Sequence, residues 1–131
     1  MGDVKQCDRE KDKKCPRDGR YQFNTAVAFN GQGDLVARYH KLQLWFEQYY
    51  NPAPEPEYSY FDTEFGRVGL EICFDLMWKE PGIALVEQYN ITTLAFTTWW
   101  FDEAPFLYST QYQSVSLIFD FMIICKSFGK I

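Results

Sequence analysis

One of the four cysteines, Cys73, has the sequence surroundings of a nucleophile. It follows the apolar run at residues 68–72, which predicts a strand, and it precedes Phe74-Asp75 and an expected turn into a helix. A nucleophile at such a turn is held at the edge of a sheet, where backbone N–H groups can bind an oxyanion. A cysteine that ends a strand is more often an inert core residue. Cys73 alone therefore leaves catalysis and core packing as competing interpretations.

The end of a second predicted strand, at residues 35–40, carries further candidates. Lys41 follows His40, the only histidine of the chain, and Glu47 lies six residues beyond Lys41. Any Cys–His protease mechanism must use His40, but no papain-type signature surrounds Cys73, and a single histidine at a strand end is more often structural. Lys41 and Glu47, each taken alone, are typical of exposed charges.

The aromatic segment Trp99-Trp100-Phe101 is the candidate for a pocket wall. It follows residues 91–98, which are rich in β-branched side chains and predict a buried strand. Aromatic residues make up 19% of the chain, so many of them must pack against each other or against something else. In isolation the segment favours the core over a substrate pocket.

Composition narrows the possible partners. The 131 residues are enough for one domain, and their net charge of −5 argues against nucleic acid, because a phosphate-binding surface needs clustered Lys and Arg. The most apolar run, residues 115–125, is interrupted by Ser116 and Asp120 and falls short of the ~20 residues of a membrane-spanning helix. The N-terminus has no apolar signal segment, so nothing in it directs export.

Other features favour an oxidising compartment. Cys7 and Cys15 lie close together in residues 1–20, a polar stretch that we interpret as a loop, and a local disulfide is favoured over two free thiols. A zinc site is disfavoured, because no further Cys or His lies at ligand spacing. Asn90-Ile91-Thr92 is a glycosylation sequon, which adds modest weight to secretion. The contrast with the N-terminus suggests that the true N-terminus is absent.

Hydrophobic patterning predicts two hairpins followed by strand–helix–strand–helix. The turn residues Asn30-Gly31-Gln32-Gly33-Asp34 separate the first pair of strands. The expected strands are residues 21–30, 35–40, 58–62, 67–72 and 91–98, and the expected helices are residues 80–88 and 104–120. This mixture indicates an α/β fold with helices packed over a sheet.

Taken together, these segments resemble the nitrilase superfamily of carbon–nitrogen hydrolases. The matching residues occur in the expected order: Tyr39-His40-Lys41, Leu44, Glu47, Gly69 to Asp75, and Glu80-Pro81. The chain is most similar to the vanin/biotinidase branch, at residues 15–25, 35–41, 61–69 and 96–99. The resemblance covers roughly residues 7–114, whereas residues 115–131 diverge from the family's pattern.

The resemblance implies an α/β fold that is part of a nitrilase-like αββα sandwich, truncated at both ends, with residues 1–131 as a partial domain. It also implies a Glu–Lys–Cys catalytic set, in which Lys41 and Cys73 match the Lys and Cys. Glu47 matches a further glutamate that orients the site. The general-base glutamate lies upstream in the family, and no residue of this chain matches it.

The implied reaction is hydrolysis of an amide in a small vitamin conjugate, such as pantetheine or biocytin. The implied enzyme is secreted or extracellular, with a membrane anchor through segments absent from this chain as the alternative. In this expected mechanism, Lys41 favours the Cys73 thiolate and, with the backbone N–H of Phe74, stabilises the oxyanion. We expect Trp99 and Trp100 to line the substrate pocket, and the implied chemistry requires no metal or organic cofactor. The small-molecule amide is the only partner implied.

A second interpretation is a non-catalytic secreted remnant or binding protein with the same fold. In either case we expect this chain alone to be inactive and prone to aggregate, because missing strands and helices would bare apolar surface. Phe96, Trp99 and Phe119 are candidates for that surface.

Overall fold

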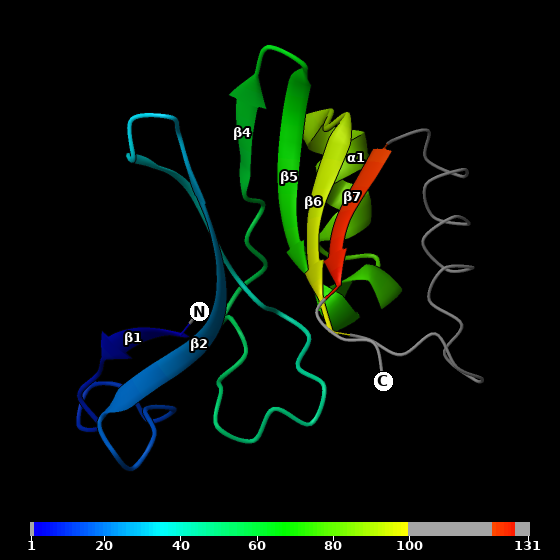
Figure 1. Ribbon diagram of the computed structural model, residues 1–131. Coiled ribbons are helices and arrows are strands. Elements are labelled where there is room, and N and C mark those ends of the chain that lie inside the picture. The colour runs from blue at the N-terminus through cyan, green and yellow to red at the C-terminus, as the bar shows by residue number, and fades with distance from the viewer. Residues whose placement is uncertain (1, 100–121, 128–131) are drawn as a thin grey trace.

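The computed structural model describes residues 2–99 and 122–127, which form two β-sheets and short helices (Figure 1). The first sheet has the antiparallel order β1-β2-β3, and the second has the order β4-β5-β6-β7. The elements are β1 (Gly2–Gln6), β2 (Arg20–Phe29), β3 (Leu35–His40), β4 (Tyr60–Thr63), β5 (Gly66–Ile72), the 3₁₀ helix η1 (Cys73–Met77), α1 (Gly82–Tyr89), β6 (Thr93–Thr98) and β7 (Met122–Ser127).

The β2–β3 hairpin sets the position of the first candidate residues. Its turn is closed by Asn30, whose side-chain oxygen accepts hydrogen bonds from the backbone N–H groups of Gln32 and Asp34 at 2.9 and 2.8 Å. Gly33 has a φ of 92°, a conformation that glycine adopts without steric cost. The resulting register pairs the last residue of β3 with the middle of β2, so Lys41 emerges beside the centre of that strand.

The second sheet combines an antiparallel hairpin with parallel strands. β4 and β5 are antiparallel, whereas β5-β6-β7 run parallel. Parallel neighbours need a crossover, and α1 supplies it between β5 and β6. The helix ends at Asn90, whose left-handed backbone (φ 54°) turns the chain back toward β6.

Both faces of β5 are covered, and its residues lie alternately on one face of the sheet and on the other. Leu70 and Ile72 point toward the first sheet and pack with Ala26 and Tyr39. Gly69 and Glu71 lie on the opposite face, where a Cβ on Gly69 would meet Leu85 and Glu71 lies beside Gly82. The helix α1 covers this face of the sheet (Figure 1). The core on the α1 side contains Leu76, Leu85, Ile91, Leu94 and Phe96. The described residues therefore form three layers: α1, the β4-β5-β6-β7 sheet and the β1-β2-β3 sheet. β5 belongs to the central layer, so its end lies between α1 and the first sheet.

Most of the predicted strands are confirmed, with boundaries shifted by one or two residues. Residues 1–20 are not entirely a loop, because β1 pairs with β2. β1 is polar and mostly exposed, so it carries no hydrophobic alternation that could reveal it. β7 was also missed, although Ile123 and Ile124 are typical strand residues.

One of the two predicted helices is confirmed, and the other falls on residues that the structure does not describe. α1 begins at Gly82 rather than at Glu80, with Pro81 in the capping position. The expected helix at residues 104–120, and with it Phe119, lies outside the described residues.

Phe96 was wrongly expected at a bared surface, since it is 1% exposed in the core beneath α1. Trp99 is 69% exposed.

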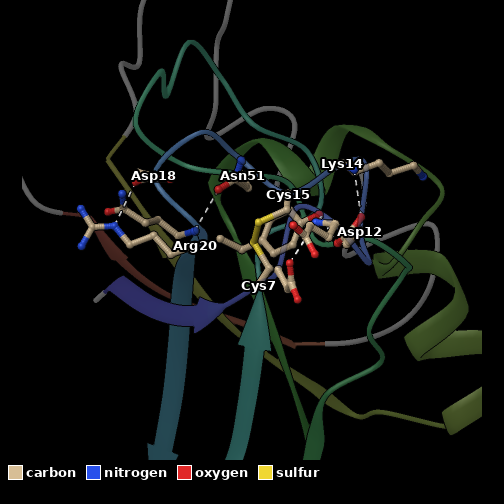
Figure 2. The surroundings of a disulfide bond; sticks show 11 residues. Cys7, Asp12, Lys14, Cys15, Asp18, Arg20 and Asn51 are labelled. Carbon is tan, nitrogen blue, oxygen red and sulfur yellow. Dashed lines mark hydrogen bonds and ion pairs between the residues drawn. A yellow bond between two sulfur atoms is a disulfide. The ribbon is translucent and has the colours of Figure 1, made fainter.

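The predicted disulfide between Cys7 and Cys15 is present (Figure 2). It closes a polar loop, between β1 and β2, that has its own hydrogen bonds. The backbone N–H of Cys7 donates to Gly19 O at 2.9 Å, and Arg20 Nε donates to Asp18 at 2.9 Å. The loop thereby brings the end of β1 to the start of β2, which favours their antiparallel pairing.

Candidate active site

Lys41 is buried directly after the end of β3. It is 1% exposed, and its backbone N–H donates to Asn24 O on β2 at 2.8 Å. Its backbone carbonyl accepts a hydrogen bond from Ala53 N at 3.1 Å, so the chain is held on both sides of the residue. A buried ammonium needs a counter-ion, and Glu47 supplies it at 2.6 Å between Lys41 Nζ and Glu47 Oε2.

Glu47 is held in one orientation by three donors. Its Oε1 accepts a hydrogen bond from Asn24 Nδ2 at 2.5 Å, and its Oε2 accepts from Trp45 N at 3.0 Å as well as from Lys41. A carboxylate bonded in this way fixes the direction of the Lys41 side chain. Of the two sequence-based readings of Glu47, an exposed charge or a residue that orients the site, this geometry favours the second.

Cys73 occupies the turn between β5 and η1. The backbone is extended at Ile72 (φ −126°) and left-handed at Cys73 (φ 51°). A non-glycine residue in the left-handed region costs about 1–2 kcal/mol, because its Cβ crowds the following carbonyl. Cys73 is a free thiol and is half-buried. A strained, partly accessible cysteine at a strand-to-helix turn is typical of a nucleophile elbow and unusual for a core cysteine.

Lys41, Glu47 and Cys73 line one pocket of about 460 Å³. Trp99 and Trp45 also line it, so the polar groups lie beside apolar walls. The structure thus brings together the residues that the sequence separates by up to 58 positions. Trp100, the other predicted wall residue, lies outside the described residues.

An aromatic row continues from the pocket along η1. The ring of Trp45 packs against Phe74 at 4.7 Å between centroids, and Phe74 packs edge-on against Trp78 at 5.9 Å. These contacts anchor the first turn of η1, which contains the residue expected to donate its backbone N–H to the oxyanion. Trp45 and Trp78 were not singled out from the sequence.

His40 faces away from this pocket and lines a different hollow. Its Nδ1 lies 2.8 Å from Glu57 Oε1, and its Nε2 lies 2.9 Å from Asp3 Oδ2. Both ring nitrogens are therefore engaged by carboxylates that join β1, β3 and the loop before β4. This arrangement favours the structural interpretation of His40 over a Cys–His pair.

Asp75 is a buried carboxylate for which the sequence pattern predicts no role. Its Oδ1 accepts a hydrogen bond from Gln43 N at 2.7 Å, and its Oδ2 accepts one from the Tyr39 hydroxyl at 2.8 Å. Burial raises the pKa of Asp75 to about 6, an effect that its hydrogen bonds partly offset. Burial and the adjacent Asp75 charge raise the pKa of Tyr39, so this hydroxyl remains a donor.

Glu71 is a second buried carboxyl group that was missed. It is 0% exposed and lies between β5 and the start of α1, where a Cβ on Gly82 would be 2.7 Å from Glu71 Oε1. Neither oxygen has a hydrogen-bond partner within the part of the chain that the structure describes. Burial, with a smaller contribution from Asp75, raises the pKa of Glu71 well above its usual range.

Two further observations concern metals and membranes. Among the side chains that the structure describes, those of residues 2–99, no group of three or more His, Cys, Asp and Glu is placed to hold a metal ion. The same residues include no helix that is long and apolar enough to cross a membrane.

Comparison with solved structures supports the fold. The chain is similar to a nitrilase-superfamily protein of Saccharomyces cerevisiae, with a TM-score of 0.68 and 19% identity over 86% of this chain and 41% of that chain. It is also similar to a glutamate-to-leucine mutant of an amidase from Nesterenkonia, with a TM-score of 0.66 and 14% identity over 82% of this chain and 41% of the amidase. That amidase structure shows covalent addition of the acetamide moiety of fluoroacetamide at its active-site cysteine.

Curated relatives are more similar in sequence. Mouse pantetheinase is 44% identical over 115 residues, which are 87% of this chain and 22% of the relative. Biotinidase of Takifugu rubripes is 44% identical over 115 residues, 86% of this chain and 23% of the relative. The chain thus spans about a fifth of their length. The sequence profile of the family described as "Carbon-nitrogen hydrolase" matches residues 8–106, well over half of the chain. The chain belongs to the carbon–nitrogen hydrolase family.

Proposed function

We propose that the protein is a thiol-dependent amidohydrolase that cleaves a linear amide with Cys73 as nucleophile. The observation that carries this proposal is the placement of buried Lys41 and the strained, half-buried Cys73 in the lining of one pocket. An ammonium beside a cysteine favours the thiolate, which is the nucleophilic form. Glu47 supports the proposal by holding Lys41 in one orientation.

In the proposed reaction, the Cys73 thiolate attacks the amide carbonyl and forms a carbon–sulfur bond. Lys41 and the backbone N–H of Phe74 stabilise the oxyanion of the tetrahedral intermediate. The carbon–nitrogen bond then breaks, the amine leaves with a proton from a general acid, and a thioester remains. Water, deprotonated by the same group acting as general base, releases the carboxylic acid and restores the thiol. The family resemblance assigns this acid–base role to a glutamate that no residue of this chain matches.

The names of the relatives direct the choice of substrate. Pantetheinase and biotinidase indicate an amide in a small vitamin conjugate, and we propose pantetheine or biocytin as the substrate class. A pocket of about 460 Å³ with apolar walls can hold part of such a molecule beside the polar groups. The covalent acetamide adduct on the cysteine of the Nesterenkonia amidase keeps its amide group, so it supports a nucleophilic cysteine on this fold and not acyl transfer itself.

The test uses this chain extended by the segments that the family resemblance implies on either side of it, including the general-base glutamate, together with pantetheine and biocytin analogues, because we expect the chain alone to be inactive. We expect an amine product from at least one of them, with a thioester on the peptide that contains Cys73, detected by mass spectrometry after acid quenching. Cys73→Ala should abolish both signals, and Cys125→Ala serves as the matched control. Turnover that persists in Cys73→Ala would eliminate the proposed nucleophile. Tight binding of an analogue without turnover by the unmodified protein would instead favour the non-catalytic binding protein.

We also propose that the protein is secreted and glycosylated at Asn90. The disulfide is consistent with an oxidising compartment, and Asn90 is exposed where α1 ends. In material secreted by eukaryotic cells, an unreduced digest should contain the Cys7 and Cys15 peptides linked. The Asn90 peptide should change mass on endoglycosidase treatment, and Asn90→Gln should remove that change. Free thiols at both cysteines and an unmodified Asn90 would contradict secretion.

A further inference from the structure

The two proposed active-site groups come from different sheets. Lys41 follows β3 of the first sheet, and Cys73 follows β5 of the second. Apolar packing of Tyr39, Leu70 and Ile72 holds the sheets together, but such contacts are non-directional. A directional connection is needed at the strand ends, because catalysis depends on placements of about 1 Å.

Asp75 makes that connection from a position two residues after Cys73. Its Oδ2 accepts from the Tyr39 hydroxyl at 2.8 Å, and Tyr39 precedes Lys41 by two residues. Its Oδ1 accepts from the backbone N–H of Gln43, two residues after Lys41, at 2.7 Å. The Asp75 carboxylate is therefore hydrogen-bonded to the chain both before and after Lys41, at Tyr39 and at Gln43. Asp75 and Tyr39 are both 0% exposed, so water does not compete for these bonds.

We propose that Asp75 is a positioning residue, which acts through Tyr39 and the Gln43 backbone to hold Lys41 against the Cys73 elbow. The inference rests on the proposed function, because it takes Lys41 and Cys73 as the reacting pair. Asp75 needs no contact with substrate in this role. At neutral pH it is largely ionised and accepts both hydrogen bonds, since its pKa is about 6. Hydrogen bonds to a charged acceptor are about twice as strong as neutral ones.

The test measures how fast iodoacetamide labels Cys73 across a range of pH, with the labelled peptide identified by mass spectrometry. Tyr39→Phe removes one of the two bonds to Asp75, together with the 3.4 Å bond from the backbone N–H of Leu42 to the Tyr39 hydroxyl. It leaves the Asp75 carboxyl group in place and fills nearly the same volume. We expect it to slow labelling at pH 7 by about threefold to tenfold, since the effect of the Lys41 charge on the thiolate weakens with distance. The pH profile of labelling should move to higher pH.

Asp75→Asn separates positioning from simple electrostatics. Removing a negative charge near Cys73 would by itself favour the thiolate and make labelling faster. Loss of the hydrogen bonds that hold the Lys41 segment would instead make labelling slower. We expect slower labelling. The double variant Tyr39→Phe/Asp75→Asn should be no slower than the worse single variant, because both changes break one linkage.

Tyr58→Phe is the matched control. It removes a tyrosine-to-carboxylate hydrogen bond of 2.9 Å, to Glu80, outside the Lys41–Cys73 linkage. We expect it to leave the labelling profile unchanged. Fast labelling of Cys73 that is unaffected by Tyr39→Phe, or accelerated by Asp75→Asn, would overturn the positioning role alone. If iodoacetamide labels Cys73 of the unmodified protein no faster than it labels an ordinary free cysteine, the proposed nucleophile is wrong, and this inference is wrong with it.

Discussion

Replacing Lys41 with methionine is expected to lower the proposed amide hydrolysis by about 10²–10³-fold, the cost of losing one oxyanion donor. Methionine nearly keeps the length and apolar character of the lysine side chain, but it has neither the charge nor the N–H donors of the ammonium, including the donor to Glu47. Two functions of the ammonium are lost together in this variant, because it both favours the Cys73 thiolate and stabilises the oxyanion. The measurement is steady-state kinetics on the chain extended with the general-base glutamate, using the analogue that this extended protein cleaves best, and the loss is expected mainly in kcat.

The same replacement should destabilise the fold. Lys41 is 1% exposed, and its removal leaves the Glu47 carboxylate, with a side chain 21% exposed, without its counter-ion. Breaking one side of a buried ion pair typically costs about 3–5 kcal/mol. Glu47 keeps its bonds from Asn24 and Trp45, so we expect the lower end, about 3 kcal/mol, in urea unfolding.

A double variant separates the two effects. Lys41→Met/Glu47→Gln removes both charges, and it should recover much of the lost free energy of unfolding without recovering activity. If the double variant regains activity together with stability, then Lys41 contributes to folding alone and its catalytic role is wrong. If Lys41→Met is inactive yet as stable as the unmodified protein, the ion pair is energetically neutral.

The strands that carry the proposed catalytic residues could be predicted because they are apolar. β3 and β5 have runs of apolar residues bounded by turn signals, and the boundaries of β3 were predicted correctly. The position of Cys73 at a strand end followed directly. β1 could not be predicted in this way, because its pairing with β2 depends on the backbone and on the nearby disulfide loop rather than on burial.

The pocket could be predicted only in part. The family resemblance suggested that Lys41, Glu47 and Cys73 lie together, but spacing along the chain gave no reason for it. Asp75 and Tyr39 were missed as partners, because their hydrogen bond joins two sheets across 36 residues. Such a contact depends on how the sheets pack, which local pattern does not encode. Glu71 was missed for a related reason, since a glutamate within an apolar strand gives no indication of which layer will cover it.

Glu71→Gln is expected to make the protein more stable than the unmodified form at pH 8, with an advantage that shrinks as the pH is lowered. Glu71 is fully buried without a hydrogen-bond partner in the described part of the chain, and its pKa is raised well above the usual range. The unfolded chain loses this proton near pH ~4.3, whereas the folded protein keeps it to a higher pH. The folded state therefore binds more protons between these values, and its stability falls as the pH rises.

Within that window, each rise of one pH unit should lower the free energy of unfolding of the unmodified protein by about 1.4 kcal/mol. Glutamine has the same shape and does not titrate, so Glu71→Gln removes this contribution. Asp75, with its pKa raised to about 6, adds a slope of the same sign between pH ~3.8 and 6, and that slope remains in the variant. The difference between the two proteins, taken from urea unfolding at each pH, isolates Glu71.

Glu87→Gln is the matched control, because Glu87 is exposed on α1 and the same charge is removed there. We expect its stability relative to the unmodified protein to vary by less than about 0.5 kcal/mol over the same pH range, as is usual for surface substitutions. A Glu71→Gln difference that is equally flat with pH would mean that Glu71 is ionised and paired in the folded protein. Glu71 would then have a cationic or hydrogen-bonding partner, and the layer between β5 and α1 would be polar rather than dry.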